Sequence, residues 1–147
     1  MIEIKTNNQN SDTHFSNNEN KTILERAFFG KNNCLKISLN KNKDCYFQFG
    51  MKKESSWQWK NVKFSDIELG QLYKFIQKSN YENNNSNNNS ISFYHKYNDK
   101  STQIWVNRYN DNIIIKTNDI SKSLSEGEQM VLSILIERII LQKSFVW

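Results

Sequence analysis

Proline is absent from the 147 residues, and cysteine and histidine occur only twice each. No apolar run approaches the length of a membrane span. The cysteines and histidines have no close ligand spacing, which excludes a zinc signature. No glycine-rich nucleotide fingerprint or phosphate-binding loop occurs, and no nucleophile and base are spaced as in a catalytic group. These absences predict a protein that is not an enzyme and that has no cofactor or metal.

The start of the chain lacks the apolar central region of a signal peptide. Cys34 and Cys45 both fall in predicted strands, and the expected strand pairing places Cys34 opposite Lys52, far along the ladder from Cys45. A disulfide between them is therefore not expected, which fits an intracellular protein. The sequence does not indicate a compartment within the cell.

Hydrophobic residues make up 37% of the chain, below the usual range for a globular domain. The deficit comes largely from asparagine, which dominates residues 7–20 and 83–89. We expect a flexible Asn-rich tail over residues 1–20, and a single domain over residues 21–147 with a mobile Asn-rich loop at 80–90. The net charge of +5 and the pI of about 9.1 favour an anionic partner such as nucleic acid, although a mildly basic soluble protein has the same balance.

Alternation of apolar and polar side chains predicts two paired strands in the first half of the chain. Residues 35–39 and 45–51 both alternate with period two, as a strand with one buried face does. A three-residue connection at 42–44 pairs Leu39 with Phe47 and keeps the apolar faces together. We prefer this register to that of a two-residue turn, which mixes the faces.

A third extended segment covers residues 57–64, and a bulge is expected in it because its apolar positions change parity. Ser65 and Glu68 then form a capping box that opens a helix ending near Ser79. Residues 22–29 are either a short helical turn or a strand leading into the sheet.

Three further strands are predicted at 91–96, 103–107 and 113–116. The turn Asn110-Asp111 tolerates the left-handed backbone of a two-residue hairpin. It pairs Val106 with Ile115 and keeps both faces of the hairpin consistent.

A second capping box, Ser125 with Glu128, opens a helix over residues 126–143 that is apolar nearly all round. Such a helix is usually buried on more than one side, most economically against a partner subunit. We expect a homo-oligomer formed through this helix; the alternative is a helix sunk centrally in a monomer. The predicted fold class is α+β, with two antiparallel meanders of three strands, each followed by a helix.

The outward residues of the predicted strands are rich in aromatics, lysines and amides, and contain no acid. They are Lys36, Tyr46, Gln48, Tyr94, Lys96, Gln103, Trp105, Asn107 and Lys116. Bases stack on aromatic rings for roughly 1–3 kcal/mol each, and lysines contact the phosphates. This surface suits single strands better than duplex, because no helix resembles a basic recognition helix. The alternative is that the aromatics form cross-strand pairs or pack against another subunit.

Trp57 and Trp59 share one face of their segment and are either stacking platforms or core residues. Because tryptophan is largely buried on average, we expect at least one of them in the core. His95 lies in a predicted strand, where a lone histidine is more often structural than catalytic.

Three stretches resemble, in their order and spacing, the Whirly family of single-stranded DNA-binding proteins. Trp59–Leu72 is similar to that family's Trp, polar residues, capping Ser and Glu-apolar-Gly helix start. Phe93-Tyr94-His95 is similar to its Phe-Phe-His, and Ser121–Trp147 to its long apolar final helix that closes near a Trp. Residues 29–35 depart from the family's Lys-Gly-Lys-Ala-Ala-Leu stretch, which is associated there with DNA binding and higher assembly.

The resemblance implies two roughly perpendicular antiparallel sheets with two helices, and a tetramer packed through the helices. It also implies that single-stranded nucleic acid lies across sheet edges with its bases against aromatics. A related two-protein complex of kinetoplastid mitochondria, which binds guide RNA, shares this fold, so RNA is not excluded.

We therefore predict sequence-tolerant binding of single-stranded DNA in DNA maintenance, repair, recombination or transcription. The predicted binding residues are Lys31, Lys36, Tyr46, Gln48, Trp57, Trp59, Lys60, Tyr94, Lys96, Trp105, Asn107 and Lys116. The alternatives are a single-stranded RNA-binding or editing accessory, and a protein-interaction or assembly module that binds no nucleic acid. No membrane partner is expected.

Overall fold

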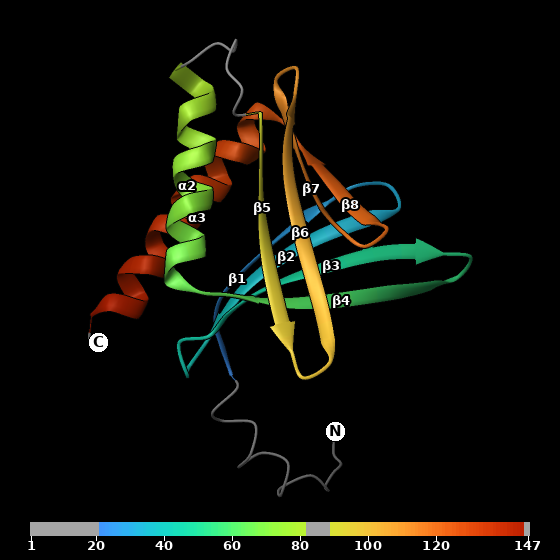
Figure 1. Ribbon diagram of the computed structural model, residues 1–147, viewed down its shortest axis with the longest axis horizontal. Coiled ribbons are helices and arrows are strands. Elements are labelled where there is room, and N and C mark those ends of the chain that lie inside the picture. Colours follow the sequence, from blue (N-terminus) through green and yellow to red (C-terminus); the bar gives the residue numbers. More distant parts are fainter. Residues whose placement is uncertain (1–20, 82–88, 146–147) are drawn as a thin grey trace, which may run out of the picture.

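The computed structural model describes residues 21–81 and 89–145, which form eight strands and two helices (Figure 1). The strands are β1 (Thr22–Phe29), β2 (Asn33–Asn40), β3 (Cys45–Lys53), β4 (Ser56–Phe64), β5 (Ser90–Tyr97), β6 (Lys100–Tyr109), β7 (Asn112–Thr117) and β8 (Ile120–Leu124). The helices are α2 (Asp66–Tyr81) and α3 (Glu126–Ser144). The expected tail over residues 1–20 and most of the expected loop at 80–90 lie outside the described residues.

The strands form two antiparallel four-stranded sheets, each followed by a helix. Sheet A has the order β1-β2-β3-β4 and sheet B the order β5-β6-β7-β8. The α+β class and the two meanders are therefore confirmed, but the prediction of three strands in each meander is wrong. Residues 22–29 are a strand at the edge of sheet A, and β8 is a short strand at the edge of sheet B that the sequence analysis missed.

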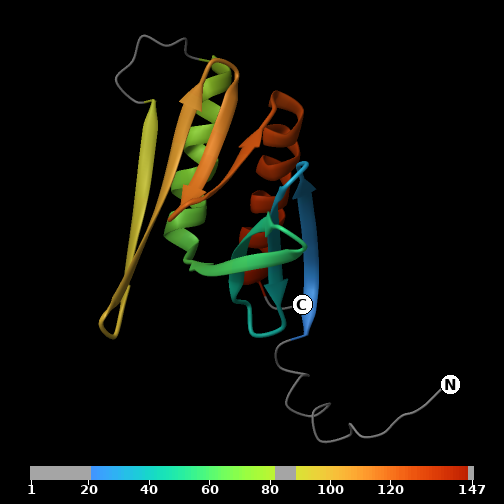
Figure 2. The same ribbon diagram turned by 90° about the vertical axis from the view of Figure 1, so that its right-hand side faces the viewer.

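The strands of sheet A run across those of sheet B, and the two helices lie side by side (Figures 1 and 2). The inner faces of both sheets and both helices contribute to one hydrophobic core. Phe64 links the sheets within this core, since its ring centroid is 4.0 Å from that of Phe47 and 5.4 Å from that of Phe93. The opposite face of each sheet is left as the outer surface.

The register between β2 and β3 differs from the predicted one by two residues. Leu39 pairs with Cys45 instead of Phe47, and Cys34 lies opposite Gly50 instead of Lys52. Beyond the hydrogen bond from the Asn40 N–H to the Asp44 carbonyl, the turn does have three residues, but they are 41–43. Lys43 takes the left-handed conformation with a φ of 68°. The faces stay consistent because a shift of two residues preserves the alternation.

The predicted bulge in β4 is absent, because the pairing with β3 is continuous from Phe64, opposite Cys45, to Ser56, opposite Lys53. The change of parity has another cause. Val62 and Phe64 face the core, whereas Trp57 and Trp59 face the opposite side of the same regular strand.

The predicted hairpin between β6 and β7 is confirmed, with Val106 opposite Ile115 and Asn110 in the left-handed conformation at a φ of 56°. Both capping boxes are confirmed as well. The Ser65 and Ser125 hydroxyls accept from the backbone N–H groups of Glu68 and Glu128, whose carboxylates accept from the backbone N–H groups of the two serines.

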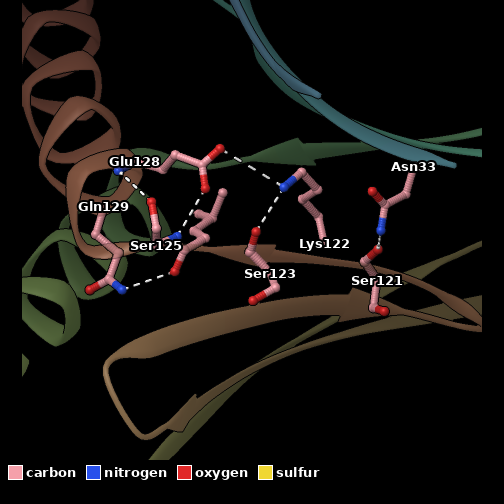
Figure 3. A network of polar contacts seen from close by, with 8 residues as sticks. Asn33, Ser121, Lys122, Ser123, Ser125, Glu128 and Gln129 are labelled. Atoms are coloured by element: carbon pink, nitrogen blue, oxygen red, sulfur yellow. Dashed lines mark hydrogen bonds and ion pairs between the residues drawn. The ribbon is translucent and has the colours of Figure 1, made fainter. Parts of the chain in front are cut away.

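Polar contacts join β8 to its neighbours and to the start of α3 (Figure 3). Lys122 is buried, and its Nζ donates to the Ser123 carbonyl at 2.7 Å and lies 4.0 Å from the Glu128 carboxylate. The Asn33 amide donates to the Ser121 carbonyl at 2.8 Å, which ties sheet A to the same strand. The buried Gln129 amide donates to the Leu124 carbonyl at 3.0 Å. These contacts satisfy polar groups that would otherwise destabilise the interior.

Cys34 and Cys45 are both free and buried. Burial raises the pKa of the Cys34 thiol, and it raises the pKa of the Cys45 thiol to about 12. Both therefore remain protonated and unreactive at neutral pH. Neither helix within residues 21–81 and 89–145 is long and apolar enough to cross a membrane.

Candidate nucleic-acid interface

The predicted binding residues do not share one surface. Those on the outer face of sheet A are Lys36, Tyr46, Gln48, Trp57 and Trp59, and those on the outer face of sheet B are Tyr94, Lys96, Trp105, Asn107 and Lys116. Because both sheets turn their inner faces to the common core, these two outer faces lie on different sides of the molecule. The expectation of a single aromatic face is therefore wrong.

Trp57 and Trp59 lie side by side on the outer face of sheet A. Their ring centroids are 5.7 Å apart and their planes are inclined by 22°, so the rings are stacked. Trp57 is 37% exposed and Trp59 is 47% exposed. The expectation that at least one of them belongs to the core is therefore wrong, and both rings are available to a ligand.

Trp59 is fixed in place by its neighbours. Gly50 lies directly opposite it in β3, and a Cβ atom at Gly50 would come within 2.7 Å of the indole ring. The Lys36 ammonium lies 5.5 Å from the ring centroid, within the range of a cation–π contact. An aromatic ring that is ordered before binding loses less entropy when a base stacks on it.

Lys52 belongs to the same face, although the sequence analysis did not select it. It is exposed and lies directly opposite Trp57 in the β3–β4 hairpin. The alternation of the strand could have identified it, because Lys52 lies on the same face of β3 as Tyr46 and Gln48. With Lys36, it gives the face a lysine beside each tryptophan.

Beside the tryptophans, the outer face of sheet A forms a polar hollow of about 450 Å³. The hollow is lined by Thr22, Glu25, Lys36, Ser38, Asn40, Tyr46, Gln48 and Asn61. The Glu25 carboxylate lies 3.9 Å from the Lys36 ammonium. The expectation of a face without acids is therefore wrong, because it left β1 out of the sheet. A phosphate would compete with Glu25 for Lys36.

A larger groove of about 780 Å³ separates the end of β4 and the start of α2 from the β5–β6 hairpin. It is lined by Tyr46, Asn61, Val62, Lys63, Ser65, Ile67, Glu68, His95, Lys96, Tyr97 and Thr102. Tyr46 and Asn61 line both the groove and the polar hollow, so the two depressions adjoin. Of the predicted residues, the groove brings together only Tyr46 and Lys96.

Glu68 and His95 meet in this groove. The His95 Nε2 atom lies 2.6 Å from the Glu68 carboxylate, and the Phe64 ring packs edge-on against the imidazole with the centroids 6.2 Å apart. The contact ties α2 to β5, as a structural histidine does.

On the outer face of sheet B, Trp105 lies opposite Ser92 and Lys116 on the neighbouring strands. Trp105 is 37% exposed, and Tyr94, one strand away, is 61% exposed. This face therefore also offers aromatic rings beside a lysine.

The two remaining predicted lysines lie apart from the tryptophan face, which is the outer face of sheet A around Trp57 and Trp59. Lys31 is exposed in the connection between β1 and β2. Lys60 alternates with Trp59 and Asn61 along β4, so it points to the opposite side of sheet A, where it pairs with Phe49. Among residues 21–81 and 89–145, no group of three or more His, Cys, Asp or Glu side chains is placed to hold a metal ion.

No protein-family model matches the sequence, and no curated protein matches it. Among solved structures, the chain is similar to one in the crystal structures of Trypanosoma brucei MRP1/MRP2, with a TM-score of 0.59. The match covers 91% of this chain and 93% of that chain, at 4% sequence identity. At this identity the likeness concerns the fold alone, and it shows that the two crossed meanders with their helices are a fold that this chain shares with MRP1/MRP2.

Proposed function

We propose that the protein binds single-stranded nucleic acid, with DNA favoured, across the outer face of sheet A. The observation that carries this proposal is the exposed pair Trp57 and Trp59, whose rings are 5.7 Å apart. Bases stack on such rings, while Lys36 and Lys52 beside them neutralise phosphates. Exposed tryptophans side by side on a sheet face are costly in a soluble protein unless a ligand or partner covers them.

The net charge of +5 and the shared fold with MRP1/MRP2 support this proposal. The alternative of a single-stranded RNA-binding accessory is supported by the Whirly resemblance, because the related kinetoplastid complex that binds guide RNA shares that fold. In the second alternative, an assembly module, the face that carries Trp57 and Trp59 is buried against a partner protein. In each case we propose an intracellular binding role without catalysis, and for the DNA-binding form a role in maintenance, recombination or transcription of DNA.

Fluorescence anisotropy with a labelled dT strand of about 12 nucleotides, a matched duplex and a single-stranded RNA tests the proposal across a salt series. We expect binding to dT that weakens as salt rises, because lysines displace counterions from phosphates, and weak binding to duplex. Equal or tighter binding to RNA would favour the accessory role. Binding to none of the three at low salt would leave the assembly module as the better account.

We further propose that the protein is a homo-oligomer, with a tetramer implied by the Whirly resemblance. The fully buried Leu132, Ile136 and Ile139 share one side of α3, and burial of a second side against a partner subunit stays a prediction. On the other side, Met130 and Ile134 are more than half exposed, and Leu141 is 45% exposed. These three lie on one side of α3 at helical spacing and form an exposed apolar stripe that Glu137 interrupts.

Substitution of Ile134 by Asp is expected to dissociate the oligomer to monomers without unfolding it. Ile134 is 60% exposed in the protomer, so the substitution should not destabilise the protomer fold. It should destabilise the contact between copies, where a buried charge is strongly unfavourable. Sedimentation velocity measures the outcome at fixed protein concentration. Gln71→Glu, which adds the same charge to an exposed polar position of α2, is the control. A wild-type protein that sediments as a monomer would contradict the proposal directly.

A further inference from the structure

The groove between the sheets is built from two sheet edges and is lined by both apolar and polar side chains. One wall comes from β4, the edge of sheet A, and the other from β5, the edge of sheet B. Its apolar lining comes from Ile67 and Tyr97, which are 71% and 78% exposed, and from the buried Val62 of β4. An apolar groove with a few polar groups is the usual form of a site for a flat organic ring.

Among the polar groups that line this groove is the Glu68 carboxylate. Its Oε1 accepts from the Ser65 backbone N–H at 2.9 Å, and its Oε2 lies 2.6 Å from His95 Nε2, which supplies the proton in that contact because a carboxylate only accepts. Each carboxylate oxygen can accept two hydrogen bonds, so one acceptor position on each oxygen remains. The Glu68 side chain is only 18% exposed, so water is partly excluded from around a donor that binds to it.

Each Glu68 oxygen can accept one further hydrogen bond. The four bases differ in whether they offer two adjacent donors to such a carboxylate. Guanine presents two adjacent donors, N1–H and the N2 amino group, on its Watson–Crick edge. Adenine and cytosine place a ring-nitrogen acceptor beside their amino group, and thymine flanks its single N–H with carbonyl oxygens. Only guanine therefore offers a pair of adjacent donors to the two carboxylate oxygens, in the way that bidentate side-chain contacts discriminate between bases.

We propose that this groove binds a guanine base through Glu68, so that the protein prefers single strands that carry guanine at one position. This inference rests on the proposed function, because the strand must lie on the outer face of sheet A. Tyr46 and Asn61 line both the groove and the hollow of that face, which gives one nucleotide a path from the face into the groove. Lys63 and Lys96 line the same groove and can contact the neighbouring phosphates, although a phosphate would compete for Lys63 with Asp44, whose carboxylate lies 3.1 Å away.

The direct test compares dT strands of about 12 nucleotides that carry one central dG, dA, dC or deoxyinosine. We expect the dG strand to bind about tenfold more tightly than the dA strand, the order of discrimination that one bidentate contact provides. The deoxyinosine strand keeps N1–H and loses the amino group, so its affinity should lie between the two. Equal affinities for the dG and dA strands would overturn the inference while leaving binding to dT, and with it the proposed function, intact.

Glu68→Gln is the informative variant, because Gln also completes a capping box and so preserves the start of α2. The amide of Gln replaces one acceptor with a donor, so the dG and dA strands should bind the variant with equal affinity. Asp66→Asn removes a charge from the same helical turn outside the groove, where Asp66 pairs with Lys143 at 3.0 Å, and should keep the ratio. A preference for guanine that survives in Glu68→Gln would rule out this contact.

A second measurement does not depend on the tryptophan face. Guanosine and adenosine monophosphate are titrated into the ¹⁵N-labelled full chain, and amide shifts are followed by NMR. Guanosine monophosphate should shift the amides of groove residues such as Asn61 and Thr102, and adenosine monophosphate should shift them less at the same concentration. Equal shifts with the two nucleotides, or none at millimolar concentration, would count against the groove even if dT binds well.

Discussion

Replacing both Trp57 and Trp59 by alanine is expected to weaken binding of a dT strand by about thirtyfold or more. Each base–aromatic stack contributes roughly 1–3 kcal/mol by alanine substitution, so the loss of two stacks costs at least about 2 kcal/mol. Both rings are substantially exposed, so their removal should leave the core unchanged. Anisotropy titrations at constant salt measure the loss, and thermal denaturation verifies the fold.

The outer face of sheet B supplies the matched control for this prediction. Tyr94→Ala with Trp105→Ala also removes two exposed aromatic rings, but from the other side of the molecule. If the strand lies on sheet A, this pair should change the affinity by less than about threefold, the range of surface substitutions away from a site. A large loss with Tyr94 and Trp105, and none with Trp57 and Trp59, would place the strand on sheet B and refute our proposal for sheet A.

Features governed by neighbouring residues could be predicted from the sequence. The capping serines Ser65 and Ser125 satisfy backbone groups three residues away, so their effect does not depend on the rest of the fold. The β6–β7 register follows in the same way from Asn110, whose side chain tolerates the left-handed backbone that a two-residue turn needs.

The β2–β3 register could not be predicted with equal certainty, because the left-handed residue of its turn is Lys43. Lysine has no particular preference for that conformation, whereas the neighbouring Asn42 has. Two registers that differ by two residues bury the same face, so the hydrophobic pattern alone does not distinguish them.

Charged residues in strand positions obscured the remaining strand of each sheet, since residues 22–29 were expected to be either a helical turn or a strand, and β8 was not predicted. In β8 the inward position between Ile120 and Leu124 is Lys122. Its ammonium donates to the Ser123 carbonyl of the same strand and lies 4.0 Å from the Glu128 carboxylate, which belongs to the following helix (Figure 3). The turn before it nevertheless carried a signal. Asn118 has a φ of 53° and is followed by an aspartate, like the turn recognised at Asn110.

The tryptophan face was misjudged for a different reason. The average burial of tryptophan does not say which face of a strand a particular tryptophan occupies. Val62 and Phe64 fix the inward parity of β4, and an uninterrupted strand then requires Trp57 and Trp59 to point outward. The bulge expected from the sequence would have turned these two rings into the core.

Replacing Phe64 by alanine is expected to lower the free energy of unfolding by about 4 kcal/mol, the typical cost of removing a buried phenyl group. Phe64 is 1% exposed, and its ring stacks on Phe47 of sheet A and meets Phe93 of sheet B edge-on. The substitution therefore leaves a cavity where the two sheets join. Urea denaturation at fixed protein concentration measures the change, since oligomerisation would otherwise alter the apparent stability.

The size of this effect distinguishes a shared core from two independently stable sheets. A loss of about 4 kcal/mol is a large part of the 5–15 kcal/mol that usually stabilises a domain, so a single cooperative transition at much lower urea is expected. Phe29→Ala is the control, because Phe29 is 70% exposed and should change stability by less than about 0.5 kcal/mol. Two separate transitions in Phe64→Ala would mean that the sheets unfold independently, and that the groove between them is not held rigidly enough to select a base.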